Sequence, residues 1–112
     1  MTVAHAKPRE SKYQASVIKK LKNLFPGCVV LKNDPFHQQG ILDILILYKD
    51  RWASLEIKSS ATSPVRPNQD YFVEQLDEMS FAAYIYPEIE EEVLSALQQA
   101  FEPPRRARIS KS

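Results

Sequence analysis

Three ionisable residues stand inside two consecutive apolar segments of the chain. Asp43 interrupts the apolar run 41–47, and Glu56 and Lys58 occur in the segment 53–58. Because successive side chains of a strand point to opposite faces, Glu56 and Lys58 would share one face. If the two segments form a hairpin across residues 48–51, Asp43 lies beside Glu56, with the two side chains about 5 Å apart. Two carboxylates at that separation can share one divalent cation.

The same residues also allow a structural interpretation. Lys58 could pair with Glu56 or Asp43 near solvent at a strand end, and an inward charge on an edge strand discourages aggregation. A charge within an apolar strand is nevertheless costly to bury unless it is paired, hydrogen-bonded or bound to a metal. An aspartate in one strand followed by a Glu-x-Lys pair in the next favours a functional site over structural ion pairs.

Composition excludes several classes of protein. The chain has 112 residues, of which 44% are hydrophobic and 26% charged, and this length predicts one domain with a single core. No apolar run reaches the roughly 18 residues of a membrane span, so we expect no membrane role. The first ten residues lack the apolar core of a secretory signal. The chain has a single cysteine, Cys28, which excludes an internal disulfide and indicates a reducing, cytoplasmic compartment. We expect Cys28 to lie in the core and to have no catalytic role.

The net charge does not identify a nucleic-acid-binding protein, because the formal value is only +1. The distribution is more informative, since basic residues cluster in the segments 7–22 and 105–111. Such clusters either contact phosphate groups or form a solvated face.

Hydrophobic periodicity predicts the element order α-β-β-β-α-β-α. The predicted elements are a helix at 10–25, strands at 28–32, 41–48 and 52–59, a helix from about 67 to 79, a strand at 81–86 and a helix at 87–101. Residues 1–9 are expected to form a flexible basic arm, residues 10–102 the folded domain and residues 103–112 a basic tail. The near-continuous apolar run at 41–48 predicts burial on both faces.

The order of elements predicts the topology. The first three strands would form an antiparallel meander, and the following helix would lead by a right-handed crossover to a fourth strand parallel to a neighbour. The expected fold class is therefore α/β, with a mixed four-stranded central sheet flanked by helices.

Two helices contribute further candidate residues. Glu10 lies three residues before Tyr13, which places it on the inward face of the first helix, and Gln14 one turn later could brace it. A carboxylate there is also favoured by the helix dipole alone. Gln69 lies one turn before Phe72 on the apolar face of the second helix, where it is either functional or simply polar at a helix start. We expect Glu10, Asp43, Glu56 and Lys58 to converge.

These residues resemble the motif of the PD-(D/E)xK nuclease superfamily, and the chain is similar to its small stand-alone members, the VRR-NUC-type nucleases and the archaeal-type Holliday junction resolvases. The resemblance covers roughly residues 10–86 and implies a restriction-endonuclease-like core. Glu10 resembles the acid of the first helix, Asp43 the metal-binding aspartate, Glu56 and Lys58 the Glu-x-Lys pair, and Gln69 the glutamine that opens the next helix. The chain departs from the motif at Leu42, where the family pattern has proline.

The chemistry of phosphodiester hydrolysis agrees with these residue types. The reaction needs an in-line hydroxide and charge neutralisation on the phosphate, and Mg²⁺ or Mn²⁺ bound by oxygen ligands supplies both. We expect Asp43, Glu56 and the Ile57 carbonyl to bind one cation, and Glu10 to bind a second metal or a metal-bound water. Lys58 would orient or deprotonate the attacking water, or hold the phosphate. Gln69 would position the substrate or Lys58.

The expected function is that of a metal-dependent endodeoxyribonuclease, acting on branched DNA in the manner of a Holliday junction resolvase. The alternatives are a structure-independent or nicking nuclease, and an inactive DNA- or protein-binding module with the same fold. We expect no nucleotide cofactor. Because one site cuts one strand, duplex or junction cleavage implies a homodimer, and a compact nuclease of this kind would suit a phage. The predicted DNA contacts are Lys7, Arg9, Lys12, Gln14, His37, Ser59 and Arg66.

Overall fold

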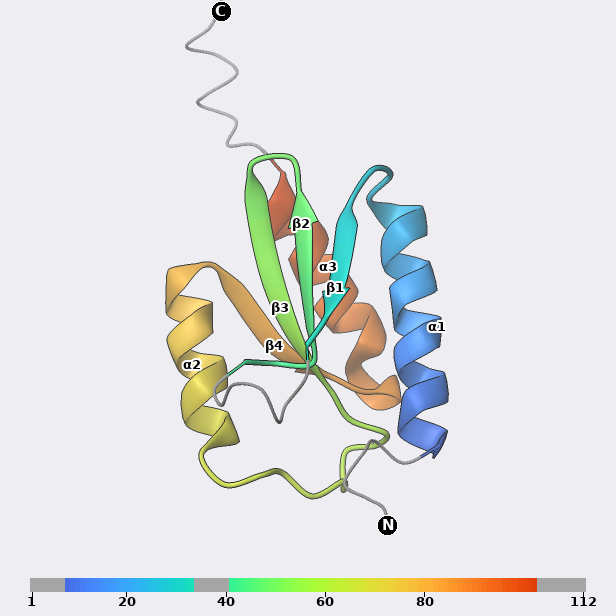
Figure 1. Ribbon diagram of the computed structural model, residues 1–112, viewed down its shortest axis with the longest axis vertical. Helices are drawn as coiled ribbons and strands as arrows, with labels where there is room; N and C mark the ends of the chain where they lie inside the picture. Colours follow the sequence, from blue (N-terminus) through green and yellow to red (C-terminus); the bar gives the residue numbers. More distant parts are fainter. Residues whose placement is uncertain (1–7, 34–40, 103–112) are drawn as a thin grey trace, which may run out of the picture.

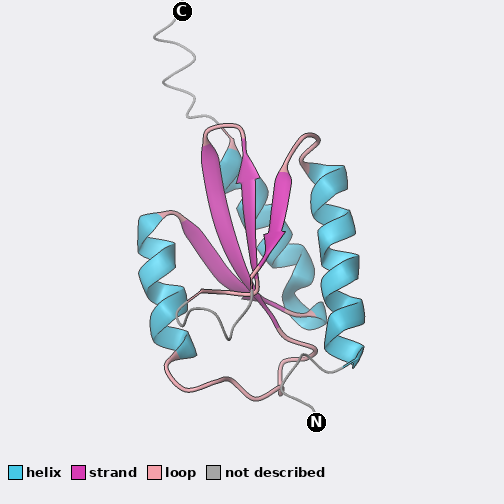
Figure 2. Cartoon of the chain, viewed as in Figure 1, coloured by secondary structure: helices cyan, strands magenta, loops and turns pink. Residues whose placement is uncertain are grey.

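The computed structural model describes residues 8–33 and 41–102, and within these ranges it contains three α-helices, a 3-10 helix and four strands (Figures 1 and 2). The helices are α1 (Pro8–Leu24), α2 (Gln69–Met79) and α3 (Glu90–Phe101), and the 3-10 helix η1 (Pro87–Ile89) precedes α3. The strands are β1 (Val29–Lys32), β2 (Ile44–Tyr48), β3 (Arg51–Ile57) and β4 (Phe81–Ile85). The predicted order α-β-β-β-α-β-α is confirmed.

The four strands form one mixed sheet in the order β1-β2-β3-β4. β1 and β2 pair antiparallel, as do β2 and β3, while β4 runs parallel to β3 after the crossover through α2. The β2–β3 hairpin turns at residues 49–50 and pairs Ile44 with Leu55. The predicted meander and the parallel fourth strand are therefore both confirmed.

The two faces of the sheet have different environments. One face is apolar and packs against α1 and α3, with Ile44, Ile46 and Leu55 of the sheet fully buried beneath Val17 and Leu97 of these helices. Because side chains alternate along a strand, Glu56 lies on the other face. Helix α2 covers that second face over β4, where the Tyr84 hydroxyl donates a hydrogen bond to Asp70. The mixed α/β arrangement is thus three-layered.

Helix α1 begins and packs slightly differently from the prediction. It starts at Pro8, two residues earlier than expected, because proline is well tolerated in the first helical turn, where its missing N–H is not needed. Its buried residues are Val17, Leu21 and Phe25, with Phe25 just past the helix end. Leu24 follows Val17 and Leu21 at helical spacing in the sequence, which predicts the same face, but it is exposed. Lys20 forms an ion pair with Glu90 and so joins α1 to α3.

Several element ends also differ from the prediction. β2 starts at Ile44 instead of residue 41, because the Asp43 N–H donates to the Glu56 side chain and not to the backbone ladder. Helix α2 starts at Gln69 instead of residue 67. The residue before it, Asn68, has a φ of 66°, a left-handed conformation that asparagine tolerates and that ends the preceding loop.

The prediction that β2 is buried on both faces is wrong. Leu47 is 37% exposed, and its neighbours Val29 and Leu31 on β1 are 50% and 44% exposed. These three side chains lie on the same face as Glu56, because Val29 and Leu31 pair with Leu47 and Leu45 of β2. Helix α2 packs against β4 at the far side of this face, and it therefore leaves β1 and β2 uncovered.

Candidate functional site

Asp43 and Glu56 lie opposite one another where β2 begins and β3 ends. The last ladder pair, Ile44 with Leu55, places the adjoining residues side by side. The Asp43 N–H donates to Glu56 Oε1 at 3.2 Å, and the N–H of Ile57, the residue after Glu56, donates to Asp43 Oδ2 at 2.8 Å. Each carboxylate thus satisfies a backbone donor of the opposite strand, and the predicted proximity of the two acids is confirmed.

Burial makes this pair electrostatically costly. Glu56 is only 6% exposed, and its loss of solvation, followed by the repulsion of the Asp43 charge, raises its pKa to about 7. Burial also raises the pKa of Asp43, against the lowering effects of the Ile57 N–H, the Arg66 charge and a hydrogen bond with Glu56. Two nearby carboxylates with raised pKa values are typical of a site that a cation would relieve.

Arg66 provides positive charge to the pair. Its Nη2 donates to Glu56 Oε2 at 2.9 Å, and its side chain is 47% exposed whereas that of Glu56 is 8% exposed. Arg66 lies in the loop between β3 and α2, shortly before Gln69. Sequence reasoning placed Arg66 among the DNA contacts and did not predict its ion pair with Glu56, because a loop residue carries no periodicity that would indicate its direction.

Lys58 follows the end of β3 and does not form the structural ion pair that was considered for it. Among residues 8–33 and 41–102, no ion pair joins Lys58 to Asp43 or Glu56. Its Nζ lies over the rings of Tyr84 and Tyr86, at 5.3 and 5.1 Å from their centroids, and donates to the Ala61 carbonyl at 3.5 Å. These are cation–π distances, so the ammonium is held at the strand end without a counter-charge from the two acids.

Tyr84 and Tyr86 are therefore part of the candidate site, because their rings hold the Lys58 ammonium. Tyr84 is the register partner of Glu56 in the parallel β3–β4 pair, so its side chain shares the face of Glu56. Burial and the neighbouring Asp70 carboxylate raise the pKa of the Tyr84 hydroxyl. The available signal was the alternation along β4, which gives Tyr84 and Tyr86 the same face.

Gln69 is the buried polar residue at the start of α2. It is 5% exposed, and its Nε2 has no hydrogen-bond partner within the described part of the chain. Its backbone N–H donates to the Arg66 carbonyl at 3.1 Å, which ties the helix start to the loop that carries Arg66. Leaving a buried donor unpaired costs about 1–3 kcal/mol, and such a group needs a reason, which a bound substrate or ordered water would supply.

Glu10 lies in the first turn of α1, as predicted, and is partly buried. Glu10 does not converge with Asp43 and Glu56 as expected. The described residues contain no group of three histidine, cysteine, aspartate or glutamate side chains able to hold a metal. The physical reason is the layering of the fold. Helix α1 packs on the apolar face of the sheet, whereas the Glu56 side chain lies on the opposite face.

The predicted DNA contacts are only partly brought together. Lys7 and His37 lie outside the described residues, and for Arg9 the structure describes only the backbone, in α1. Lys12 is exposed and Gln14 partly buried on α1, which packs on the face of the sheet away from Glu56. Ser59 Oγ shares a hydrogen bond with Ser63 Oγ at 2.8 Å, beside Lys58.

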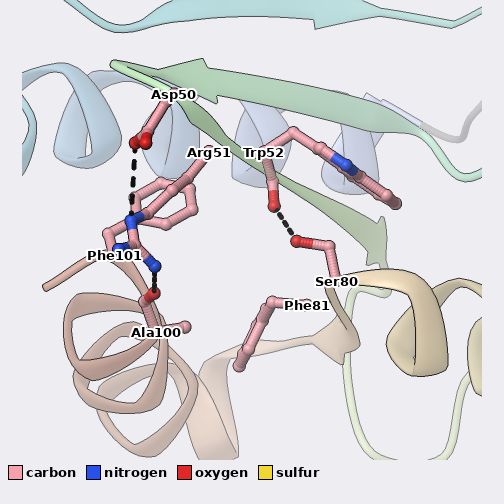
Figure 3. A pocket seen from close by; sticks show the side chains of 7 residues that line it. All are labelled: Asp50, Arg51, Trp52, Ser80, Phe81, Ala100 and Phe101. Carbon is pink, nitrogen blue, oxygen red and sulfur yellow. Dashed lines mark hydrogen bonds and ion pairs between the residues drawn. The ribbon is translucent and has the colours of Figure 1, made fainter. Parts of the chain in front are cut away.

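A hollow lies at the end of the β2–β3 hairpin opposite Asp43 and Glu56 (Figure 3). Its polar groups are engaged in structural contacts, since Arg51 Nη1 donates to the Ala100 carbonyl at 3.4 Å and the Ser80 hydroxyl donates to the Trp52 carbonyl. Arg51 also approaches Asp50 at 3.6 Å. The hollow therefore joins the hairpin turn to α3 and is separate from Asp43 and Glu56, which lie at the other end of the same strands.

The Asp43–Glu56 end of the sheet offers hard oxygen ligands. In a strand the N–H and C=O of one residue point to the same neighbouring strand, and the Ile57 N–H is directed at Asp43, so the Ile57 carbonyl is directed to that side too. Two carboxylates and one carbonyl suit Mg²⁺ or Mn²⁺, which retain several waters.

The described part of the chain contains no helix with the length and apolar character of a membrane span.

Comparisons with known proteins do not identify the chain. No model of a known protein family matches it, and the comparisons with curated proteins and with solved structures found no match.

Proposed function

We propose that this protein is a metal-dependent endodeoxyribonuclease with Asp43, Glu56 and Lys58 at its active site. The observation that carries the proposal is that the Asp43 and Glu56 carboxylates each accept a backbone N–H of the opposite strand at the end of a hairpin, with the ammonium of Lys58 at the same strand end. Burial raises the pKa values of both acids although Arg66 pairs with Glu56, so the pair can accept further positive charge.

Each residue has a distinct task in phosphodiester hydrolysis. Asp43, Glu56 and the Ile57 carbonyl would hold Mg²⁺ or Mn²⁺, which when bound supplies charge neutralisation on the phosphate and activation of water. Lys58, positioned by the rings of Tyr84 and Tyr86, orients or deprotonates the water or holds the phosphate. Gln69 positions the substrate or Lys58 through its unpaired amide. Glu10 is given no task here, because α1 packs on the face of the sheet away from Glu56.

The restriction-endonuclease-like fold and membership of the PD-(D/E)xK superfamily belong to the same proposal. They are supported by the mixed four-stranded sheet and by the positions of Asp43, Glu56 and Lys58 at the ends of two adjacent strands. The natural substrate would be branched DNA, with a homodimer supplying one site for each strand. Cleavage of linear duplex by the same chemistry is the alternative within this class.

The direct test is cleavage of a four-way DNA junction, the matched linear duplex and single-stranded DNA in Mg²⁺ and in Mn²⁺. Asp43→Asn should abolish cleavage, and Asp50→Asn is the matched control because Asp50 is exposed at the other end of the hairpin. Cleavage of the junction alone supports a resolvase. Cleavage of all three supports a general nuclease, and metal-independent cleavage or an active Asp43→Asn variant would refute the proposed site.

A binding module without catalysis is the second candidate, and the Glu56–Arg66 ion pair favours it. In that case Arg66 would be a permanent structural partner of Glu56 and no cation would bind. DNA binding without cleavage of any substrate, together with unchanged stability on addition of Mg²⁺, would support this second function and exclude the first.

A further inference from the structure

Both carboxylate oxygens of Glu56 are occupied by donors. Oε1 accepts from the Asp43 N–H, and Oε2 accepts from Arg66 Nη2 at 2.9 Å. The first donor is backbone, fixed by the hairpin that ends at Ile44 and Leu55. The second is the tip of a long side chain that is 47% exposed. Oε2 is therefore the oxygen of Glu56 that a cation can reach by displacing a donor.

The loop that carries Arg66 allows such an exchange without a change in the backbone. Pro67 follows the residue directly, and a residue before proline is restricted to an extended conformation. The Arg66 carbonyl accepts from the Gln69 N–H, which fixes the loop to the start of α2. Farther back, Ser63 Oγ accepts from the Ser60 N–H at 3.1 Å. Only the arginine side chain needs to rotate.

The Arg66 guanidinium and a divalent cation would each compensate the buried negative charge of Glu56. A buried carboxylate whose partner leaves becomes an uncompensated charge, so ionised Glu56 releases Arg66 when another cation takes its place. The Asp43 carboxylate adds to this demand, because the Arg66 charge lowers the pKa values of both acids. A divalent ion offers more positive charge to the same two carboxylates than one guanidinium does.

We propose that Arg66 acts as a stand-in cation on Glu56, that a divalent metal ion displaces it from Oε2, and that the released guanidinium then binds a phosphate of the nucleic-acid substrate. Planar guanidinium groups suit bidentate contacts with phosphate. Cation binding and phosphate binding are thereby coupled through one side chain. This inference rests on the proposed function, because it requires the metal site of Asp43 and Glu56.

The exchange predicts the effect of removing Arg66 on cation affinity. When a ligand must displace an internal competitor, its apparent association constant equals the intrinsic constant multiplied by the fraction of time that the site is free. If Arg66 occupies Oε2 about 90–99% of the time, Arg66→Gln should bind Mn²⁺ about 10- to 100-fold more tightly than the native protein. Lys58→Gln is the matched control, since it removes a positive charge at the same strand end from a residue that makes no ion pair with Glu56.

The experiment measures Mn²⁺ binding to the full chain by calorimetry for the native protein and both variants. A second measurement follows the Arg66 side-chain Nε–H resonance by NMR during titration with diamagnetic Mg²⁺. We expect the tenfold or greater gain for Arg66→Gln, a change below about threefold for Lys58→Gln, and faster exchange of the Arg66 Nε–H with solvent once Mg²⁺ is bound.

Three results would overturn the exchange. Equal or weaker Mn²⁺ binding by Arg66→Gln, or an Arg66 resonance that stays unchanged in saturating Mg²⁺, shows that Arg66 and the cation do not compete, and the proposed nuclease site survives this outcome. An equal gain in the Lys58→Gln variant shows a general charge effect. Absence of cation binding in every variant removes the metal site itself, and the proposed function fails with it.

Discussion

Replacing Glu56 with glutamine removes a buried charge while it preserves the size of the side chain and an oxygen that can accept from the Asp43 N–H. The native carboxyl is 6% exposed and has its pKa raised from 4.5 to about 7 by burial and by the Asp43 charge. Since one pKa unit corresponds to about 1.4 kcal/mol, the ionised form of Glu56 costs the folded protein about 3 kcal/mol.

The sign of the pH dependence follows from where the proton is bound. Between pH 4.5 and about 7 the folded protein keeps the proton on Glu56, and the unfolded chain has already lost it. Stability of the native protein therefore falls as the pH rises through this window. Glutamine does not ionise, so the stability of Glu56→Gln relative to the native protein should increase by about 3 kcal/mol between pH 4.5 and pH 8.

The assay is urea unfolding followed by the fluorescence of Trp52, the single tryptophan, with EDTA present to exclude divalent cations. Glu74→Gln is the control, because Glu74 is exposed on α2. The stability of this variant relative to the native protein should not increase between pH 4.5 and pH 8. A difference between Glu56→Gln and the native protein that is independent of pH, or that shrinks toward pH 8, would refute the interpretation. Glu56 would then be stabilised as an anion, as in a structural ion pair.

Four further outcomes follow from the same geometry. At pH 8, Mg²⁺ at 100 times its dissociation constant should stabilise the native protein by about 2.7 kcal/mol and leave Glu56→Gln unchanged in thermal unfolding. Gln69→Met should leave the stability in urea unchanged or increase it, because the buried Nε2 has no partner among the described residues, yet cleavage should fall at least tenfold. Tyr84→Leu should slow cleavage by about five- to thirtyfold, because a cation–π contact worth about 1–2 kcal/mol that positions Lys58 is lost. Phe101→Ala should destabilise the protein to urea by about 3–5 kcal/mol without affecting Mn²⁺ affinity, since this 5% exposed ring packs on Phe25 far from the carboxylates.

The fold could be predicted largely because its signals are local. The period of Tyr13, Val17 and Leu21 predicts an amphipathic helix, and the apolar segments around Asp43 and Glu56 predict two strands joined by a tight turn. A hairpin register depends on the turn, so the pairing of Ile44 with Leu55, and with it the approach of the two acids, was already implied by the sequence. The parallel fourth strand followed from the handedness of crossovers.

The element ends and the cover of the sheet were harder to predict. The strand β2 is shorter than its apolar run because the Glu56 side chain takes the place of a ladder acceptor for the Asp43 N–H. Leu47 looked buried on sequence grounds, but α2 packs over β4 and leaves it exposed. Neither fact is local, since each depends on an element distant in the chain.

The sequence by itself determined which residues share a strand face and which acids meet across the hairpin, because alternation and turn length are properties of neighbouring residues. Only the tertiary structure decided what contacts those acids. It placed Arg66 on Glu56, seated Lys58 on Tyr84 and Tyr86, and packed the helix of Glu10 on the other face of the sheet. Long side chains and loops follow no period, so their partners are set by how separate elements pack and by the demand of a buried charge for compensation.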